Sequence, residues 1–407
     1  QENLSKAQYR LKFEELFYIQ LQLLRKKIIR KSKLKGYIFE AVGDKFNSFY
    51  NNNLPFELTG AQKRVLKEIR KDVASNIHMN RLLQGDVGSG KTIVALLTML
   101  IAIDNNFQSA LMAPTEILAT QHFKALVDLL DGIDVRIELL TGSVKAKKRR
   151  EIHQQLENGT LHILIGTHAL LEDKVVFKNL GIAIIDEQHR FGVKQRLEIT
   201  EKGQNVDVLV MTATPIPRSL ALTAYGDMNI SSIKEKPTGR IPIKTYVMPH
   251  SKLEDVLLSI RRAISKGDLI YWVCPLIEES EGLDLVAVNE RYEFLKNYFV
   301  DLQISLVHGK QNQEEREKSI EQFKIGKSKI LVATTVIEVG VDIPDATIMV
   351  IECAERFGLA QIHQLRGRVG RSSKQSSCIL LYKSQLTPIA HSRLKILKET
   401  DDGFQIA

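Results

Sequence analysis

One short segment of the chain combines glycines, a lysine and a threonine at the spacing of a phosphate-binding loop. It reads GDVGSGKT and fits the pattern G-x-x-x-x-G-K-[S/T], with an apolar run before it and a helical pattern after it, the context that the motif requires. Backbone N–H groups and a helix start favour a bound polyphosphate, whose β- and γ-phosphates Lys91 would reach, while the Thr92 hydroxyl would bind Mg²⁺. The predicted nucleotide contacts are Gly85, Asp86, Val87, Gly88, Ser89, Gly90, Lys91 and Thr92.

A second group of polar residues stands at the end of an apolar run: Asp186, Glu187, Gln188 and His189. Two adjacent carboxylates at the end of a buried strand need partners. A divalent cation at Asp186 and a water polarised by Glu187 would supply them, so Asp186 is a predicted metal ligand beside Thr92, and Glu187 a predicted catalytic residue. Gln188 and His189 would then lie next to the γ-phosphate and relay its loss to a second domain.

Two further segments are weaker indicators on residue type alone. Met211–Pro215 follows another apolar run, and its threonine hydroxyls could accept a hydrogen bond from His189 and link the nucleotide site to a nucleic-acid groove. Leu58–Gln62 precedes a helical pattern, and the carboxamide of Gln62 could bind an adenine edge through both of its polar groups. We therefore add Gln62 to the predicted nucleotide contacts.

An arginine-rich segment, QLRGRVGR, lies far from the phosphate loop along the chain. Arg368 and Arg371 are three residues apart, so a helical turn would direct both toward one point. Guanidinium groups from a second domain can neutralise the charge that develops in phosphoryl transfer, which predicts both arginines as catalytic residues. A basic patch that contacts nucleic acid is the alternative, and we assign that role to Arg366.

Other polar residues follow predicted strands and would gather at one edge of each sheet. Thr334 and Thr335 could donate to nucleic-acid phosphates, and Asp342 could hold the catalytic arginines or a ribose, so it joins the predicted nucleotide contacts. Three more loops could contact phosphates in the same way: Pro114–Glu116, Thr141–Ser143 and Gly166–His168.

The elements that must position these residues alternate between short apolar runs and longer helical patterns. Such βα units build an open, mostly parallel sheet, whose inner strands are apolar throughout because both faces are buried. The first series of predicted strands is Arg81–Gln84, Ser109–Ala113, His162–Gly166, Ile182–Asp186 and Val208–Thr212. The second is Leu269–Cys274, Ser305–His308, Ile330–Ala333, Ile348–Ile351 and Ile379–Tyr382. We predict an α/β protein with two similar lobes and a cleft between them.

Length and charge agree with this organisation. The 407 residues suffice for two or three domains with a core each. Residues 1–50 are predicted to form a basic, amphipathic helical linker. Residues 1–35 hold ten Lys/Arg against three Asp/Glu, and for this segment alone a polyanionic partner and a solvated face explain the charge equally well. The turn-rich segment 236–239 would separate a first lobe, 51–236, from a second, 237–407.

The composition also indicates the cellular compartment. The chain shows neither the apolar core of a signal peptide nor an apolar run long enough to span a bilayer, so we expect a cytoplasmic protein. Its three cysteines lack CxxC spacing and are expected to be buried and reduced: Cys274, Cys353 and Cys378.

Taken in order, these segments resemble the motifs of superfamily 2 helicases, and within them those of the RecG family of bacterial branch-migration helicases. The resemblance runs from residue 55 to residue 383. Its supporting stretches are Gly85–Thr92, Ala113–His122, Asp186–Val193, Met211–Leu222, Tyr271–Ser280, Val332–Ile343 and Ala360–Arg371. The Mfd family of transcription-repair coupling factors is similar too, but it usually has Glu at the position of Gln188.

This resemblance implies two tandem RecA-like P-loop lobes with mostly parallel sheets. It implies an ATP-dependent DNA helicase that remodels stalled forks and Holliday junctions in recombination and repair, with ATP and Mg²⁺ as cofactors. Branched or forked DNA is the implied partner, single-stranded-DNA-binding protein a further candidate, and no membrane is involved. We expect a monomer associated with the bacterial nucleoid.

The RecG family also carries an OB-fold wedge before the lobes and a helical hairpin after them. Residues 1–50 cannot form the wedge, and the chain stops at Ala407, so we expect a motor fragment. Residues 1–50 would then be the long helix that joins wedge to motor.

Two other functions stay open at this point. An ATP-gated DNA-binding module would bind DNA without productive translocation, and an ATPase assay with and without branched DNA discriminates it. An Mfd-like translocase would act on RNA polymerase, and a pull-down with polymerase discriminates that one.

Overall fold

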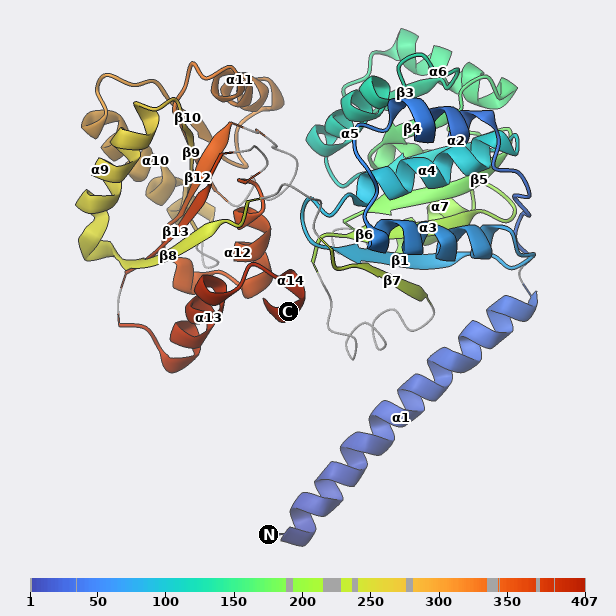
Figure 1. Ribbon diagram of the computed structural model, residues 1–407, viewed down its shortest axis with the longest axis horizontal. Helices are drawn as coiled ribbons and strands as arrows, with labels where there is room; N and C mark the ends of the chain where they lie inside the picture. The colour runs from blue at the N-terminus through green and yellow to red at the C-terminus, as the bar shows by residue number, and fades with distance from the viewer. Residues whose placement is uncertain are drawn as a thin grey trace. The chain divides into compact units, whose positions relative to one another are not determined.

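The chain folds into two compact α/β units, Gln1–Lys236 and Pro237–Ala407 (Figure 1). The computed structural model describes residues 2–33, 35–187, 193–214, 228–235, 241–275, 281–334, 343, 345–370, 374–383 and 385–406. Each unit contains a parallel β-sheet with helices on both of its faces, as the alternating sequence pattern predicts.

In the described part of the first unit, the sheet has seven parallel strands in the order β3-β4-β2-β5-β6-β1-β7. They are β1 (Asn80–Gly85), β2 (Gln108–Met112), β3 (Ile137–Leu140), β4 (Ile163–Gly166), β5 (Leu180–Asp186), β6 (Asp207–Thr212) and β7 (Asn229–Ile233). All the strands predicted for this part of the chain are present. The prediction lacks the two edge strands, β3 and β7, which are only partly buried and carry polar residues.

Helices cover both faces of this sheet, and neighbouring strand residues alternate between the two cores. In β1, Leu83 belongs to the core under one set of helices and Leu82 to the core under the other. The first set is α2 (Asp44–Ser48), α3 (Gly60–Val73), α4 (Lys91–Asp104) and α5 (Glu116–Leu129). The second is α6 (Ala146–Asn158) and α7 (Val193–Thr200).

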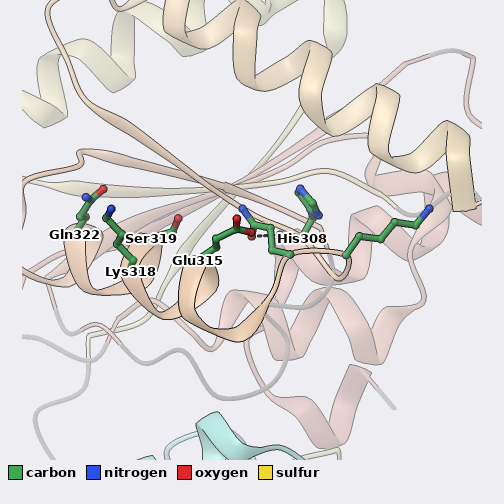
Figure 2. A pocket seen from close by; sticks show the side chains of 7 residues that line it. His308, Glu315, Lys318, Ser319 and Gln322 are labelled. Atoms are coloured by element: carbon green, nitrogen blue, oxygen red, sulfur yellow. Dashed lines mark hydrogen bonds between the residues drawn. The ribbon is translucent and has the colours of Figure 1, made fainter.

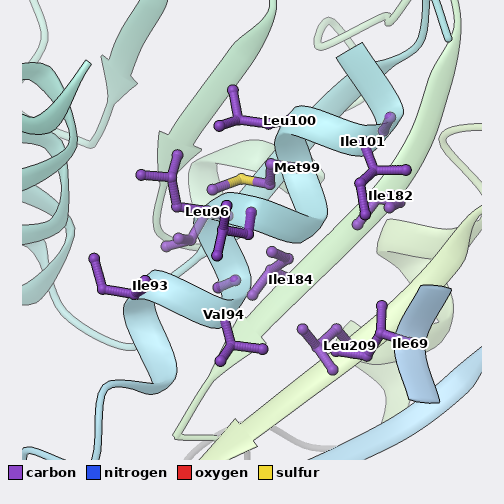
Figure 3. Close-up of a cluster of buried hydrophobic side chains, with 14 of the residues drawn as sticks. Ile69, Ile93, Val94, Leu96, Met99, Leu100, Ile101, Ile182, Ile184 and Leu209 are labelled. Atoms are coloured by element: carbon purple, nitrogen blue, oxygen red, sulfur yellow. The ribbon is translucent and has the colours of Figure 1, made fainter. Parts of the chain in front are cut away.

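Helix α4 begins at the predicted phosphate loop and is buried along almost its whole length. It contacts α2 and α3 as well as strands β1, β2 and β5. Figure 3 shows its apolar side chains against Ile182 and Ile184 of β5 and Leu209 of β6. A helix enclosed in this way is apolar on every side, and its packing fixes the start of the helix relative to the ends of the strands.

The segment before α3 is part of the first unit. Phe39 and Phe49 are fully buried in its core. The carboxylate of Asp104, at the end of α4, accepts hydrogen bonds from the backbone N–H groups of Gly43, Lys45 and Phe46 at 2.9, 3.1 and 3.1 Å. A negative charge at a helix start is stabilising, so Asp104 anchors α2.

Helix α1 (Glu2–Lys33) differs from the helical segment predicted over residues 1–50. It ends at Lys33, and residues 35–43 form no helix. Its apolar side chains do not form one stripe, because neighbours such as Leu16, Phe17 and Tyr18 are all exposed and point in different directions. The predicted amphipathic pattern is therefore wrong: a spacing that suits a helix does not by itself put the apolar residues on one face.

The described part of the second unit has a sheet of six parallel strands in the order β10-β11-β9-β12-β13-β8. They are β8 (Lys244–Pro249), β9 (Leu269–Val273), β10 (Ile304–Val307), β11 (Ile330–Ala333), β12 (Ala346–Ile351) and β13 (Ser377–Tyr382). The prediction contains every strand except β8, an edge strand with exposed residues.

Two groups of helices enclose this second sheet. One core is formed with α9 (Leu253–Ile264) and α10 (Glu281–Tyr298). The other is formed with α11 (Gln313–Lys324), α12 (Leu359–Arg366), α13 (Pro388–Glu399) and α14 (Gly403–Ile406). All three cysteines are buried and free, as predicted. None of the described helices combines the length and the apolar content that crossing a membrane would need.

Candidate nucleotide and nucleic-acid sites

The predicted phosphate loop connects β1 to α4 and depends on its glycines. Gly88 and Gly90 have φ angles of 74° and 83°, in the left-handed region that side chains disfavour. A Cβ atom at Gly90 would lie 2.2 Å from Nε2 of Gln62, and one at Gly85 would lie 2.5 Å from Oγ of Ser89. A side chain would therefore strain the backbone at Gly88 and Gly90, and at Gly85 it would collide with the neighbouring Ser89.

Lys91 is the first residue of α4, and its side chain is buried. Its Nζ donates hydrogen bonds to the backbone carbonyls of Gly85 and Asp86, at 2.8 and 3.0 Å. The ammonium group is thus held at the loop, where a phosphate would meet it. Thr92 follows, half-buried in the first helical turn. Asp86 and Val87 are buried within the loop, and Oδ1 of Asp86 accepts the N–H of Val87 at 2.7 Å.

Gln62 braces this loop from helix α3. Its Nε2 donates to the backbone carbonyl of Ser89 at 2.9 Å, and its Oε1 accepts the N–H of Thr59 at 2.8 Å. The Thr59 hydroxyl accepts the N–H of Gln62 in return, which completes a capping box at the start of α3. Both polar groups of the carboxamide thus already have partners within the protein, a role for Gln62 that the sequence alone does not reveal.

Asp186 and Glu187 stand at the same sheet edge as the loop. Asp186 is the last residue of β5 and pairs in register with Met211 of β6, while Gln84 of β1 pairs with Thr212. Since the strands are parallel, their carboxyl ends place the phosphate loop, the two acids and the Thr212–Thr214 segment together. The site residues that sequence reasoning assigned to the first unit, where the structure describes them, therefore lie at one edge.

The carboxylate of Asp186 is buried and hydrogen-bonded at both oxygens. Oδ2 lies 2.8 Å from Nε2 of His122 in α5, and Oδ1 accepts the N–H of Glu187 at 3.1 Å. Burial alone would raise the pKa of Asp186, but the hydrogen bond and charge of His122, with contributions from Lys91 and the Glu187 amide, hold this pKa below its ordinary value. Asp186 is therefore an anion suited to a hard cation.

Glu187 adopts an uncommon backbone conformation. Its φ angle is 51°, which is rare for a residue with a side chain and is often found at functional sites. Its Oε2 lies 3.5 Å from the backbone nitrogen of Ala213. Beside it, the hydroxyls of Thr212 and Thr214 are 2.9 Å apart. The carboxylate of Glu187 thus points along the sheet edge toward this segment.

Four predicted site residues lie outside the described residues: Gln188, His189, Asp342 and Arg371. The hydrogen bond predicted between His189 and the Thr212–Thr214 segment and the pairing of Arg368 with Arg371 therefore stay predictions. So does the contact predicted for Thr335.

The three loops predicted to contact phosphates follow β2, β3 and β4, at the same edge of the first sheet. The Thr115 side chain accepts the N–H of Leu118 and caps α5. The Thr141 and Ser143 hydroxyls are 2.9 Å apart. The Thr167 hydroxyl is buried and has no hydrogen-bond partner among the described residues. Hydroxyls and N–H groups in this row suit the phosphates of a nucleic-acid strand.

In the second unit, the role assigned to Arg366 is wrong. Its side chain is 2% exposed, too little for a nucleic-acid contact. The guanidinium donates to the backbone carbonyls of Leu397 and Thr400 at 2.8 and 2.9 Å, and it lies 2.8 Å from Nδ1 of His363. Arg366 therefore ties α12 to the end of α13. The sequence alone does not show whether an arginine in this motif is buried or exposed.

Arg368 is only partly buried, and it lies in a turn just after α12. The helical turn assumed for Arg368 and Arg371 does not extend this far, because α12 ends at Arg366 and Gly370 has a φ angle of 77°. The spacing argument for these two arginines therefore does not apply, and their proposed role rests on the family pattern.

The second unit also has a buried charge cluster that sequence reasoning did not find. Glu352 follows β12, is 4% exposed and accepts hydrogen bonds from Arg291 at 2.9 and 2.5 Å and from Nε1 of Trp272 at 3.2 Å. Burial alone would raise the pKa of Glu352, but Arg291, Trp272 and His250 lower it. The residue stays ionised and joins α10 to the sheet.

A polar hollow of about 570 Å³ lies between the end of β10 and helix α11 (Figure 2). His308, Lys310 and Lys318 are among its lining residues. The turn beneath it is braced: Gln311 accepts the N–H of His308 at 3.0 Å and donates to Leu306, and Arg316 donates to two carbonyls of the turn. Glu315 lines the hollow as well, so its lining is polar and of mixed charge.

Comparisons with known proteins identify the units. The DEAD/DEAH box helicase family model matches residues 59–223, and the helicase conserved C-terminal domain model matches residues 251–373. Solved structures at low identity share the fold: yeast Dbp5 bound to RNA and ADP BeF3 has a TM-score of 0.66 at 17% identity, over 90% of this chain and 93% of that one. The two units are tandem RecA-like helicase domains with parallel sheets.

The chain is also similar over its whole length to RecG helicases. The chain is 49% identical to the ATP-dependent DNA helicase RecG of Synechocystis over 100% of its length and 49% of that protein. For the RecG of Streptococcus pneumoniae the identity is 49%, over 98% of this chain and 59% of that protein. A RecG structure bound to a three-way DNA junction has a TM-score of 0.85 at 43% identity, over 99% of this chain and 53% of that one.

The chain spans about half the length of the curated relatives it matches. The matched region covers both units, and with them the segments that hold the phosphate loop, the acidic pair and the predicted catalytic arginines. This chain belongs to the RecG family of helicases.

Proposed function

We propose that this chain is the ATP-driven motor of a DNA helicase that remodels branched DNA, such as stalled forks and Holliday junctions, in recombination and repair. One observation carries the proposal: the phosphate loop, the acidic pair and the Thr212–Thr214 segment meet at one sheet edge, beside a row of loops with phosphate-binding chemistry. A nucleotide and a nucleic acid would then occupy neighbouring parts of the same edge, which is the arrangement that a motor needs.

A triphosphate fits the residues of the first unit. The Ser89 hydroxyl is buried without a partner among the described residues, and Gly88 and Gly90 supply the left-handed backbone conformations of the loop. Lys91 would bind the β- and γ-phosphates, and the N-terminus of α4 favours negative charge. Gln62 would hold the loop in shape: its side chain is 1% exposed and both of its amide groups are hydrogen-bonded within the protein, which supports this role and not the predicted contact with adenine.

A Mg²⁺ ion fits the donor set of Thr92 and Asp186, a hydroxyl and an ionised carboxylate. No group of three or more His, Cys, Asp or Glu among the described residues could hold a metal by itself, which agrees with an ion bound jointly with nucleotide phosphates. When bound, Mg²⁺ neutralises charge on the phosphates. Glu187 would orient the attacking water and accept its proton.

The second unit would contribute Arg368 and Arg371 to hydrolysis of the bound nucleotide, with Asp342 holding these arginines or the ribose. Gln188 and His189 would sense loss of the γ-phosphate. The support for these roles is the match of this segment to the family pattern, since guanidinium groups from a second domain stabilise the charge of the transition state.

The nucleic-acid partner in this proposal is branched or forked DNA. A relative in the same family is seen bound to a three-way DNA junction. Single-stranded-DNA-binding protein as a second partner, a monomeric state and a place at the bacterial nucleoid are expectations from the resemblance. Contacts to phosphates should make DNA binding fall steeply with salt, because each neutralised phosphate releases counterions.

Steady-state ATP hydrolysis with and without a synthetic three-way junction tests the proposal. We expect the junction to stimulate turnover in the wild type and to have no effect in Lys91→Ala, which cannot hold the triphosphate. Linear duplex of the same length is the matched control and should stimulate less. Full stimulation of the Lys91→Ala variant would refute the assignment of the site, and equal turnover with and without DNA would refute the motor.

A further inference from the structure

The hydrogen bond between His122 and Asp186 joins two elements that meet at the nucleotide site. His122 lies in the middle of α5, and Asp186 is the last residue of β5, 64 positions away in the sequence. Their exposed fractions are both 7%, and Nε2 of His122 is 2.8 Å from Oδ2 of Asp186. Both side chains are therefore buried, and the carboxylate of the pair is the one with a proposed functional role.

The direction of this hydrogen bond follows from the chemistry of the acceptor. An ionised carboxylate has no proton to give, so Nε2 of His122 carries the hydrogen and donates it. The backbone N–H of Glu187 donates to the other oxygen, Oδ1, at 3.1 Å. Each oxygen thus has one fixed donor, which sets the plane of the carboxylate, and each keeps a lone pair for a further ligand.

Packing alone does not explain a histidine at this position. Ala119 and Leu126, three residues before and four residues after His122 in α5, are fully buried in the core and already hold the helix on the sheet. An apolar side chain would bury equally well there and would need no partner. A buried imidazole has to be hydrogen-bonded, and its partner here is the carboxylate that we assign to the metal.

We propose that His122 is a positioning residue for the metal-binding carboxylate: it fixes Asp186 in the orientation that receives Mg²⁺ with the nucleotide. This inference rests on the proposed function, because it takes Asp186 as a metal ligand. Hydrogen bonds of this kind orient ligating carboxylates, and their loss typically costs about 10- to 100-fold in metal affinity or activity.

Binding of a fluorescent ADP analogue, measured by titration with and without MgCl₂, tests this role apart from catalysis. In His122→Leu, which keeps the bulk and removes the donor, we expect the apparent Mg²⁺ affinity in the presence of the analogue to fall about tenfold or more. Without Mg²⁺ the analogue should bind as in the wild type. His122→Gln places an N–H donor at a similar reach and should restore most of the Mg²⁺ affinity.

Lys124→Ala is the matched control on an exposed position of the same helix and should behave as the wild type. Thermal unfolding of each variant shows whether the fold is intact. Unchanged Mg²⁺ affinity in His122→Leu overturns the inference, as does an equal loss of binding with and without Mg²⁺, which would mark a structural role. A wild-type chain that binds no analogue in Mg²⁺ would overturn the proposed function as well, so the two failures are distinguishable.

Discussion

The Nε2 of Gln62 donates a 2.9 Å hydrogen bond to the backbone carbonyl of Ser89. This contact fixes the phosphate loop to the start of α3, where the Oε1 of the same residue accepts the N–H of Thr59. A single carboxamide therefore couples the shape of the loop to the position of a helix in the core of the first unit.

Replacement of Gln62 by Ala should weaken nucleotide binding about tenfold, which corresponds to about 1.4 kcal/mol, because the loop loses its brace. A titration with fluorescent nucleotide measures the change. Thr59→Ala is the control, since it removes part of the capping box but keeps the hydrogen bond to Ser89. It should lower stability by about 1 kcal/mol and leave nucleotide affinity as it is. Equal affinities for Gln62→Ala and the wild type would contradict the bracing role.

Replacement of Glu187 by Gln should separate nucleotide binding from hydrolysis. The amide keeps the size of the side chain and its contact with the Ala213 N–H, but it cannot accept a proton from water. We expect turnover to fall about 10²- to 10⁴-fold, with nucleotide affinity close to that of the wild type. Glu157→Gln makes the same chemical change on an exposed face of α6 and should leave turnover unchanged. Substantial turnover in Glu187→Gln would exclude this residue as the base.

Replacement of Arg291 by Met should destabilise the second unit by about 3–5 kcal/mol, because it leaves the buried Glu352 carboxylate without its cation. Trp272, the only tryptophan of the chain, donates to this carboxylate and reports unfolding of this unit by its fluorescence. The exposed pair Arg261–Asp301 provides the control: Arg261→Met should cost about 1 kcal/mol or less. A similar loss in the free energy of unfolding for the two variants would show that the buried ion pair contributes no more than the exposed one.

The cluster around Glu352 should also make the stability of the second unit fall in acid. The pKa of Glu352 is lower in the folded state than its ordinary value. Its contribution to stability is therefore present above that ordinary value and is lost as the pH falls through the folded-state pKa. The fluorescence of Trp272 should follow this loss in acid.

The buried carboxylate of Asp207 should make stability depend on pH in the opposite direction. It is fully buried at the start of β6, its Oδ1 accepts the N–H of Met79 at 2.6 Å, and its Oδ2 has no partner among the described residues. Burial, and to a lesser extent the charge of Asp72, raises the pKa of Asp207 well above its ordinary value. Its folded state is thus favoured at low pH, and stability falls as the pH rises toward the folded-state pKa.

Replacement of Asp207 by Asn should remove this pH dependence and raise the stability of the first unit at pH 8. Thermal unfolding between pH 5 and pH 9 measures both effects. The exposed Asp131→Asn is the control and should change neither. If the Asp207→Asn variant is no more stable than the wild type at pH 8, the buried carboxylate does not destabilise the first unit at that pH.

Most inner strands of both sheets are predictable from sequence because they are buried on both faces and read as unbroken apolar runs, as in Ile182–Ile185. The strands that sequence reasoning missed, β3, β7 and β8, lie at sheet edges, where partial exposure admits polar residues such as Glu138 and Ser232. Such segments look like loops, and only tertiary pairing makes them strands.

The site was predictable to the extent that its chemistry is local. The phosphate loop and the acidic pair are contiguous in the sequence, and strand ends place them together. His122 is a lone histidine in a helical pattern, and its partner becomes visible only when α5 packs beside β5. The prediction for Arg366 is wrong because the residue lies in an arginine-rich motif that suggests an exposed role. In the fold, its guanidinium instead donates to backbone carbonyls at the end of α13.

Single-turnover ATP hydrolysis by Arg371→Ala in the presence of a three-way junction measures whether the second unit takes part in hydrolysis of the nucleotide bound to the first. We predict that this variant binds nucleotide like the wild type, because the phosphate loop is intact, and hydrolyses it about 10³-fold or more slowly. A lysine at position 371 should rescue little, since it cannot form a bidentate contact. Wild-type hydrolysis by the Arg371→Ala variant would show that Arg371 of the second unit takes no part in the reaction.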